Sequence, residues 1–506
     1  ERMEATVGAE HGALLSGMML GGSGRLDEEI RELFTDNGLA HLLSVSGTHI
    51  VLLTGLLLAL LQWVPLPWRK VIVITLLTAY ALLCGLRPPV LRALAMSSVL
   101  LLGGSGAERG RLLCLVAALL LCLQPLWLAD IGFQLSFGAA AGLLWLLPAC
   151  QRLLPQALPA PIGEAAAVSL AAQLAVLPLE VYYFQQFSLI ALVSNIVLVP
   201  VLEIAAQLAL VGALLPVCGE YLLQLAAWLT AQVLTQARFF ADLPYSTVVI
   251  GKLPAYCLVL YYAALFVWAD FPWLQFWSNR ERRCILLLHA LLLAGMLAYQ
   301  QYRTLPLACY FLDVGQGDCA VIVTPSQRVA IIDTGGLKNI STATRVITPF
   351  LRYLGKREAD ILLLSHYDFD HVGAAADLLR QLRVKKLLLP NEALTEESKR
   401  VQQEILAQAG RTQAHVVQGG DALDDNAEIV LVDVPQQDVP GNEASTLAAL
   451  QSVQGSVLFT GDMGEEREQR LQLQQYTVLK AGHHGSHYSS SMEFLEQVRP
   501  RLTVIS

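Results

Sequence analysis

The sequence has 506 residues, of which 55% are hydrophobic and only 15% are charged, whereas soluble domains carry charge on roughly 25% of their positions. The charges are unevenly spread, with 17 between residues 39 and 270 but 44 in the shorter stretch from 301 to 506. These figures exclude a single soluble globule, a disordered chain, a coiled coil and a small disulfide scaffold. The net charge of −8 also argues against a surface that coats nucleic acid generally, because such surfaces need clustered Lys and Arg.

The first 38 residues mix small and charged side chains, and the stretch 25–34 fits a short amphipathic helix rather than a membrane span. We therefore predict that residues 1–38 form an amphipathic segment at a membrane surface.

Ten apolar runs follow, at 39–63, 71–86, 90–104, 112–129, 131–149, 165–179, 189–217, 221–240, 253–269 and 284–300. They predict a polytopic α-helical membrane domain of about eight to ten helices over residues 39–300. Several runs are shorter than the roughly 20 apolar residues that a straight span requires, and Pro and Gly interrupt many of them. We expect broken, re-entrant or tilted helices, which suit a pathway-forming bundle better than a simple anchor.

Polar side chains recur inside these runs, although they are costly at membrane depth unless they face water or a polar partner. Arg87 and Arg92 flank a Pro pair, and Asp130 lies one helical turn from Gln134. Three more share one helical face by their spacing: His41, Ser44 and Thr48. A contact at a helix end or between helices explains each residue alone, but the group predicts a hydrated path, with Arg87 and Arg92 as contacts for phosphate.

The last apolar run indicates an orientation. A basic cluster precedes it, formed by Arg280, Arg282 and Arg283, whereas the segment after it carries only Arg303. Basic loops tend to be cytoplasmic. We therefore expect the residues beyond 300 on the outer side of the cytoplasmic membrane.

Residues 301–506 alternate short β-type runs with helical stretches and Gly-rich turns, which predicts a layered, water-soluble α/β domain. The nine cysteines lack CxxC spacing, and seven lie in or beside apolar runs, so no zinc ribbon follows. Cys309 and Cys319 could face each other across a hairpin, and their spacing leaves open a disulfide that geometry decides.

Side chains that bind metals follow three of the predicted strands. They are His366, Asp368, Asp370 and His371 in one turn, Asp462 after a second strand, and His483 with His484 after a third. One such residue at a strand end is ordinarily solvated or capping, but clustering after three Gly-bounded strands predicts a shared metal site. Mixed His and carboxylate sets suit Zn or Mn.

The motifs HxDxDH, TGD and LKxxHHGS, with DVGQGD and IDTGG upstream, resemble the metallo-β-lactamase fold, in its branch with Asp at the second ligand position. In the first half, HLLSVSGTHI (41–50), LRPPVLRALAM (86–96) and DIGFQLSFGAAAGLL (130–144) resemble the competence domain of the ComEC-type family of DNA-uptake channels. The resemblance covers nearly the whole chain. It implies a competence-type channel domain over 39–300 and an αββα hydrolase domain over 301–506 that is C-terminally incomplete.

The resemblance also implies a ligand set for two divalent ions, Mn or Zn. His366 and Asp368 would hold one ion and Asp370 and His371 the other, while Asp462 would bridge them. His483 would complete the first site. Two features depart from the family's commoner pattern: Asp368 replaces a His, and no clear counterpart exists for a middle His, since His415 is the only His between the motifs and Asn442 with Ser445 occupies the equivalent loop.

Further roles follow from the expected phosphodiester chemistry. Asp370 and Lys480 are the candidates for catalysis, Lys480 by neutralising a non-bridging oxygen. Ser486, with Ser489 and Ser490, is the candidate for binding phosphate, although a flexible turn would also explain the Ser-rich run. The expected supports of the ligands are His484, Asp333 and Asn442. We expect Asp313, Asp318 and Asp333 to brace turns or orient ligands rather than to act in catalysis.

What the resemblance implies is a bacterial inner-membrane channel for uptake of single-stranded DNA during natural transformation, with a metal-dependent nuclease domain that degrades the other strand. The expected partners are DNA, membrane lipid, a separate DNA receptor and a cytoplasmic motor, because the chain has no P-loop. Two other classes fit the residues: a membrane-anchored metallo-phosphodiesterase acting on a lipid or wall polymer, and a channel whose hydrolase-like domain merely binds.

Overall fold

The computed structural model describes the chain apart from residues 1–5, 21–25, 44–46, 86–87, 103–105, 156, 216–217, 244–245, 270–278, 303–305, 339, 392–394, 418–428, 436–438, 440 and 454. The described chain separates into two compact units, Glu1–Leu297 and Ala298–Ser506. The division lies three residues from the domain boundary expected at 300.

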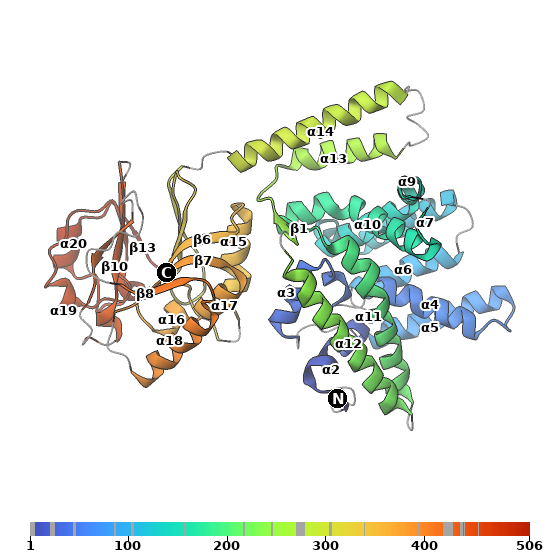
Figure 1. Ribbon diagram of the computed structural model, residues 1–506, viewed down its shortest axis with the longest axis horizontal. Helices are drawn as coiled ribbons and strands as arrows, with labels where there is room; N and C mark the ends of the chain where they lie inside the picture. The colour runs from blue at the N-terminus through green and yellow to red at the C-terminus, as the bar shows by residue number, and fades with distance from the viewer. Residues whose placement is uncertain are drawn as a thin grey trace. The chain divides into compact units, whose positions relative to one another are not determined.

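The first unit is built from helices (Figure 1), and each predicted apolar run overlaps at least one of them, so the helical fold class is confirmed. The helices are α2 (Ala9–Leu20), α3 (Glu28–Asp36), α4 (Gly47–Leu60), α5 (Leu66–Leu83), α6 (Pro88–Leu102), α7 (Gly106–Leu123), α8 (Ile131–Trp145), α9 (Leu147–Leu153), α10 (Ala160–Phe184), α11 (Ala191–Leu214), α12 (Gly219–Ala241), α13 (Ala255–Trp268) and α14 (Asn279–Tyr302). Two short strands, β1 (Gln186–Ser188) and β2 (Thr247–Val249), pair antiparallel.

Three of the described helices are long and apolar enough to cross a membrane: α5, α10 and the stretch Ala191–Ala213 of α11. The pair α8 and α9, bent by 61°, counts as a fourth if it is one broken span. The bend lies directly before Pro148, where a broken helix is expected. The helix that carried the orientation argument, α14, is not among the candidates, so the number of spans and the orientation stay predictions.

Pro178 and Pro200 differ from the expectation of broken helices, because both lie inside continuous helices, α10 and α11. Proline removes one backbone hydrogen bond, but neighbouring helices can satisfy the freed carbonyl in apolar surroundings. The Pro pair at 88 and 89 instead begins α6, where the missing N–H has no helical partner to lose.

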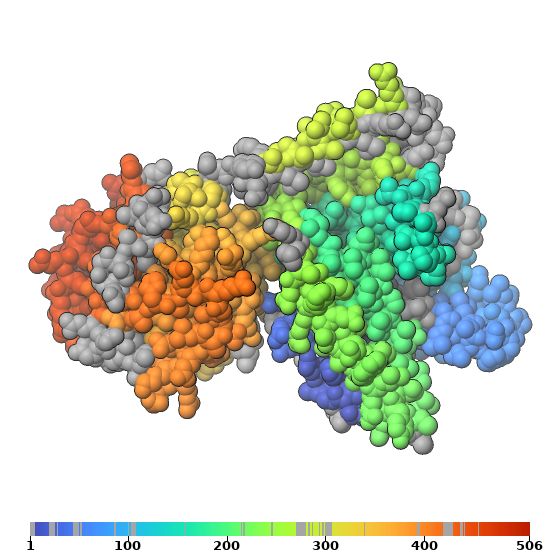
Figure 2. Space-filling model, viewed as in Figure 1, coloured from blue at the N-terminus to red at the C-terminus, as the bar shows by residue number. Residues whose placement is uncertain are grey.

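The segment expected at a membrane surface is packed into the helical unit. Leu14, Leu15 and Met18 of α2 are fully buried, as is Phe34 of α3. These helices pack on α11 and α12, which lie side by side along the face shown in Figure 2. The Asn37 side chain adds a hydrogen bond to α12, because its Nδ2 donates to the Ala237 carbonyl at 3.0 Å. The apolar face of the amphipathic stretch is therefore turned to protein, and contact of this segment with lipid stays a prediction.

The second unit is centred on two β-sheets. One has the strand order β3-β4-β5-β6-β7-β8 and the other β13-β12-β11-β10-β9. The strands are β3 (Ala308–Phe311), β4 (Ala320–Val323), β5 (Val329–Ile332), β6 (Glu358–Leu363), β7 (Arg383–Leu389), β8 (Gln413–Val416), β9 (Ile429–Asp433), β10 (Leu447–Ser452), β11 (Gly455–Phe459), β12 (Val478–Lys480) and β13 (Leu502–Val504). Strands β5 to β8 run parallel, as do β11 to β13.

Alternation along the strands divides the core into layers. Val321 and Val323 face the helices of the first sheet, whereas Ala320 and Ile322 pack against residues of the second sheet such as Leu450. Helices α15 (Thr348–Tyr353), α17 (Ala375–Gln381) and α18 (Glu396–Gln408) cover the first sheet, and α20 (Met492–Val498) covers the second (Figure 1). This is the predicted αββα sandwich, and the fold class of the second unit is confirmed.

Both cysteines of the first hairpin are free, so the disulfide that their spacing left open is not formed. Cys309 pairs in register with Ile322, whereas the Cys319 carbonyl accepts a hydrogen bond from the Leu312 N–H at 2.9 Å. The two cysteines therefore occupy different rungs of the hairpin.

Candidate metal centre

The HYDFDH turn follows β6 and leads into the short helix α16 (Phe369–Val372). Its two histidines, His366 and His371, are fully buried. Its carboxylates are more open, with side-chain exposures of 53% for Asp368 and 30% for Asp370. The turn thus combines buried histidine nitrogens with carboxylate oxygens that are accessible to solvent.

Glycines of the upstream DVGQGD and IDTGG loops let this turn approach closely. A Cβ on Gly317 would lie 2.0 Å from the Asp370 carbonyl oxygen, and one on Gly336 would lie 2.0 Å from the Phe369 carbonyl oxygen. The same loops hold the turn by hydrogen bonds, including Thr334 N–H to the His371 carbonyl at 2.7 Å. The motif glycines are therefore required because no side chain fits between these backbones.

The second sheet supplies the facing side chains. Asp462 follows β11 and is 3% exposed, and the preceding Gly461 has a φ of +54° and packs on Ser445. After β12 the chain places His483 and His484 at φ values of +47° and +54°. Consecutive left-handed residues other than glycine are energetically unfavourable and concentrate at functional sites.

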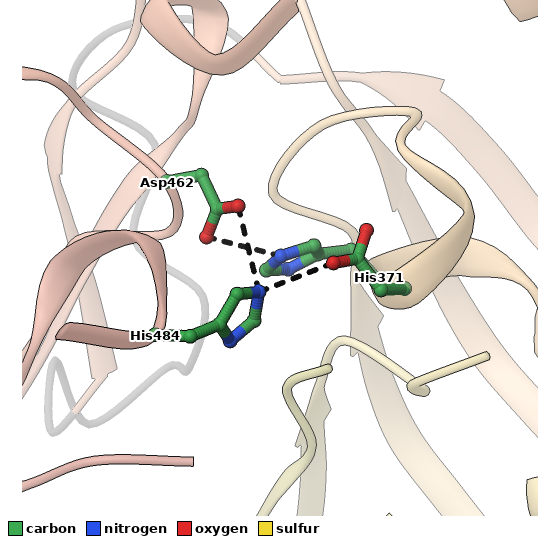
Figure 3. Close-up of side chains that lie close together, drawn as sticks. His371, Asp462 and His484 are labelled. Atoms are coloured by element: carbon green, nitrogen blue, oxygen red, sulfur yellow. Dashed lines mark hydrogen bonds and ion pairs between the residues drawn. The ribbon is translucent and has the colours of Figure 1, made fainter. Parts of the chain in front are cut away.

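Asp462 lies at the centre of the cluster. Its Oδ1 is 3.1 Å from His371 Nε2, and its Oδ2 is 3.6 Å from His484 Nε2 (Figure 3). The same Oδ2 is 4.0 Å from His366 Nε2. His484 Nε2 also lies 3.2 Å from Asp370 Oδ2. Ligand atoms of Asp370, His371, Asp462 and His484 all lie within 4.8 Å of one another.

Three buried polar atoms support metal binding at this place. His366 Nε2, His371 Nε2 and Asp462 Oδ1 are buried without a well-aligned hydrogen bond, although the last two form an ion pair at 3.1 Å. Leaving such atoms unsatisfied is costly, and imidazole nitrogen with carboxylate oxygen is the donor set of Zn and Mn sites. The residues therefore fit divalent metal, in agreement with the sequence prediction.

Two buried carboxylates orient the histidines. Asp333 Oδ2 accepts from His371 Nδ1 at 3.0 Å, and its oxygens accept from the N–H and hydroxyl of Ser365 at 2.7 and 2.8 Å. Asp318 Oδ1 lies 3.2 Å from His484 Nδ1. In both pairs the carboxylate takes Nδ1 and leaves Nε2 facing Asp462, as is usual around metal-binding histidines.

The charges of the cluster are strongly coupled. Burial disfavours the charged form of His371, yet Asp333 and Asp462 outweigh burial and hold its pKa well above the usual value. Hydrogen bonds to Asp318 and Asp370 raise the pKa of His484 to about 9. Burial, reinforced by His371, lowers the pKa of His366 to about 3. The metal-free site thus balances its carboxylates with protons on His371 and His484, which a metal ion would displace.

Of the two adjacent histidines, the structure brings His484 rather than His483 closest to the cluster. His483 Nε2 lies 4.0 Å from Asp462 Oδ2 and its side chain is 37% exposed. The sequence prediction has His483 as the ligand and His484 as its support. Sequence alone does not separate two neighbouring histidines, because the left-handed backbone decides which ring turns inward.

The side chains of Lys480 and of the serines after it contact other groups of the chain. Lys480 is buried, with its Nζ 2.8 Å from Asp318 Oδ2, so its charge is already neutralised. The Ser489 hydroxyl donates to the Gly482 carbonyl at 2.7 Å, and Ser490 Oγ accepts from the Gly482 N–H at 3.3 Å. Ser486 Oγ accepts from the Tyr488 N–H at 3.4 Å. These contacts hold Lys480 and the serines within the protein, and phosphate binding by Lys480 and Ser486 stays a prediction.

The middle loop contributes Ser445 instead of a histidine. Its Oγ accepts from the Asp462 N–H at 3.0 Å and lies 3.5 Å from His366 Nδ1. The backbone carbonyl of Asn442 accepts a hydrogen bond from the Ser445 N–H. Among the described contacts, none places the Asn442 side chain in the cluster. Sequence reasoning placed Ser445 only as an occupant of this loop, and it named no particular partner for Asp318. The Gly-Gln-Gly run directly before Asp318 was the available signal for a tightly packed loop.

The polar residues of the helical unit are only partly described. Arg87 and Ser44 lie outside the described residues, as does the Thr48 side chain. Arg92 is 5% exposed and its Nη1 contacts Asp130 Oδ1 at 3.2 Å. Gln134 accepts from the Tyr183 hydroxyl at 2.9 Å. Arg92 therefore joins α6 to α8, and phosphate contact by Arg92 would require release of Asp130.

The fold and the cluster define a metallo-β-lactamase-type domain joined to a bundle of apolar helices. Residues 18–275 match the family described as competence protein, and residues 312–506 match the metallo-beta-lactamase superfamily. The chain therefore belongs to the competence protein family, with a metallo-beta-lactamase domain after its helical unit.

Curated relatives align over almost the whole chain. ComE operon protein 3 of Bacillus subtilis (strain 168) is 29% identical over 95% of this chain and 65% of its own length. The uncharacterized protein YcaI of Escherichia coli (strain K12) is 26% identical over 98% of this chain and 65% of its own. Competence protein ComA of Neisseria gonorrhoeae is 28% identical, with shares of 97% and 69%. The chain thus spans slightly under two thirds of the first two relatives.

Proposed function

We propose that the protein is a bacterial inner-membrane channel for uptake of single-stranded DNA, and that its second unit is a metal-dependent phosphodiesterase that degrades the strand left outside. One relative is named competence protein ComA, and the family is described by the same word. DNA and membrane lipid are the proposed partners, with a separate receptor and a cytoplasmic motor. We place the second unit on the outer side of the membrane, because basic residues gather in the first turns of α14 and basic segments beside a span tend to be cytoplasmic.

One observation carries the hydrolytic part of the proposal. Nε2 of His366, Nε2 of His371 and Oδ1 of Asp462 are buried, make no well-aligned hydrogen bond and belong to one cluster, in which the last two atoms form an ion pair. A domain that only bound DNA through its surface would not need to bury three such ligand atoms without well-aligned hydrogen bonds.

The chain's own residues have defined tasks in this proposal. Bound divalent ions, Mn or Zn, would supply positive charge that polarises a phosphodiester and makes water a better nucleophile at neutral pH. His366, His371, Asp462, Asp370 and His484 would hold them. Asp333 and Asp318 fix the rings of His371 and His484 by accepting their Nδ1 protons. Asp368, half-exposed, is free to turn toward the centre, and burial together with Asp370 raises its pKa.

The direct test compares two acidic residues with the same 30% side-chain exposure, Asp370 in the cluster and Asp377 on α17. We expect the full chain, with Mn or Zn added in turn, to cleave single-stranded DNA. Asp370→Ala should abolish cleavage, and Asp377→Ala should leave it unchanged. Cleavage of a phospholipid or wall phosphodiester with DNA left intact would replace this proposal by a membrane-anchored phosphodiesterase.

A second candidate is a channel whose metallo-β-lactamase domain only binds. It is favoured by Ser445 in the loop where a histidine is expected and by Lys480, whose charge is taken by Asp318. Wild-type protein that takes up DNA and binds metal but cleaves no phosphodiester would establish it.

A further inference from the structure

Two exposed aromatic rings lie on the loops that carry the metal-type ligands. Among the described large aromatic side chains of the second unit, the exposed ones are Tyr353 at 39%, Phe369 at 52% and Tyr488 at 69%. Phe369 lies between Asp368 and Asp370 in the first sheet's turn, and Tyr488 follows His484 by four residues in the second sheet's loop. Exposing an aromatic ring to water is unfavourable, so an exposed ring on each of the two ligand loops needs a physical reason.

The Phe369 ring is held in place while it remains exposed. A Cβ on Gly336 would lie 3.1 Å from its Cδ1, and one on Gly373 would lie 3.0 Å from its Cε2. The ring therefore rests against the backbone of two glycines. A supported ring with an open surface loses little conformational freedom when a flat ligand stacks on it.

Tyr488 is anchored in a comparable way. Its carbonyl accepts from the Glu465 N–H at 3.0 Å, and its N–H donates to Ser486 Oγ at 3.4 Å. Its ring centroid lies 4.2 Å from that of His487, with the planes inclined by 36°. The ring is thus fixed by backbone and by a neighbouring ring, yet is the most exposed aromatic of the three.

Electrostatics at this site favours stacking over charge as the means of recognition. Residues 301–506 hold 25 acidic and 19 basic side chains, and Lys480, the lysine nearest the cluster in sequence, is paired with Asp318. Phosphate attraction by the protein surface is therefore weak. Every base offers an aromatic face, and proteins that bind single strands use exposed rings in this way.

We propose that Phe369 and Tyr488 are stacking positions for unpaired nucleobases on either side of the phosphate presented to the metal centre. The inference rests on the proposed phosphodiesterase function and names its substrate class as single-stranded nucleic acid. Ligand loops from opposite sheets carry the two rings, so one base can stack on each side of the reacting phosphate. Duplex DNA keeps its bases stacked on one another, and phospholipids carry no flat rings, so neither would occupy both positions.

The first experiment needs no hydrolysis. The full chain in detergent, with a chelator present, is irradiated with a single-stranded oligonucleotide that carries 5-iodouracil, and the crosslinked peptides are identified by mass spectrometry. We expect crosslinks at Phe369 and Tyr488. Crosslinks found only elsewhere in the chain would overturn the inference, whatever the protein cleaves. Crosslinks at the two rings without any cleavage would instead contradict the proposed hydrolysis and leave the inference standing.

The second experiment measures cleavage efficiency on a base-bearing oligonucleotide and on one of equal length with abasic sugars. Phe369→Ala and Tyr488→Ala should each lower the cleavage efficiency on the base-bearing strand roughly five- to hundredfold. Both variants should cleave the abasic strand as efficiently as wild type does. Phe369→Tyr should restore cleavage, and Tyr353→Ala, an exposed ring on α15, should have no effect. Equal losses on both strands, or faster cleavage of phosphatidylglycerol vesicles than of either strand, would overturn the inference.

Discussion

At the scale of single residues, the centre depends on side chains that hold other side chains. Asp333 and Asp318 do not need to touch metal to matter, because each holds one imidazole in the orientation that turns Nε2 inward. Ser365 in turn holds Asp333 through two hydrogen bonds. Sequence analysis placed Asp318 and Asp333 as turn braces or orienting residues, and the contacts agree with that interpretation.

Replacing Asp333 by Asn should weaken metal binding about 10- to 100-fold, the loss usual for a residue that orients a ligand. The amide retains the size of the carboxylate but can no longer favour the His371 tautomer with its proton on Nδ1. Calorimetric titration with Mn would measure the change. The control is Asp360→Asn. Asp360 lies on β6, and its carboxylate accepts a hydrogen bond from Lys385. Equal affinity of Asp333→Asn and wild type would contradict the assigned role.

The same coupling makes the metal-free second unit sensitive to pH in both directions. The pKa of His484 is raised to about 9, so its stabilising contribution is complete below the unfolded value near 6.5 and is lost as pH rises through 9. The pKa of His366 is lowered to about 3, so its contribution is present above 6.5 and is lost as pH falls toward 3. We expect maximal stability near pH 6.5.

Urea unfolding of the chelator-treated protein over pH 4 to 9 would reveal this maximum through the circular dichroism of the second unit. Added Mn should shift the optimum upward, because the ion replaces protons on the histidines. A stability that rose steadily from pH 6.5 to 9 without metal would contradict the coupling.

At the scale of elements, close helix packing in the first unit depends on glycine. A Cβ on Gly142 of α8 would lie 2.6 Å from both the Ala171 carbonyl oxygen and the Ala175 Cβ of α10. Small residues of this kind let membrane-type helices approach. Gly132 leaves room for the ion pair between Arg92 and Asp130. A Cβ on Gly132 would lie 2.7 Å from Arg92 Nη2 and would push the guanidinium away from Asp130.

Gly142→Ala should destabilise the helical unit by about 1 to 3 kcal/mol, the usual cost of overpacking. The clash involves backbone on α10, which cannot move aside like the end of a flexible side chain. Thermal unfolding followed by tryptophan fluorescence would measure it. Gly55→Ala on α4 is the matched control, because no atom lies within 4 Å of its added Cβ. Equal loss in both variants would contradict the packing explanation, because Ala has a higher helix propensity than Gly and the substitution should otherwise stabilise a helix.

At the scale of the whole molecule, the two units have separate hydrophobic cores. All eight tryptophans lie between residues 63 and 277, in the first unit. Tryptophan fluorescence therefore reports only on the helical unit, whereas metal should bind only in the second. This distribution makes the independence of the two units measurable in the intact chain.

Saturating Mn should raise the unfolding temperature of the second unit and leave the tryptophan transition unchanged. A ligand at 100 times its Kd adds about 2.7 kcal/mol to the state that binds it, and a chelator should reverse the effect. Far-ultraviolet circular dichroism in the β-sheet region, recorded beside tryptophan emission, would separate the transitions. A metal-dependent shift of the tryptophan transition would show that the units unfold as one.

Much of this architecture could be predicted, because apolar runs, strand alternation and glycine-bounded turns are local features. The helical unit, the αββα sandwich and the gathering of His366, His371 and Asp462 at strand ends follow from such features and from the family resemblance. Helix continuity through Pro178 and Pro200 could not be predicted, since it depends on neighbours that satisfy the freed backbone groups.

The sequence by itself determined the two units, their solvents and the chemical type of the centre, since composition and residue spacing are properties of the chain. Only the tertiary structure decided that His484 lies nearer Asp462 than His483 does. It also decided that Asp318 pairs with Lys480 and that Asp130 pairs with Arg92. These choices depend on contacts between segments far apart in the chain. A side chain's partner is set by backbone direction and burial, and neither is encoded in its immediate neighbours.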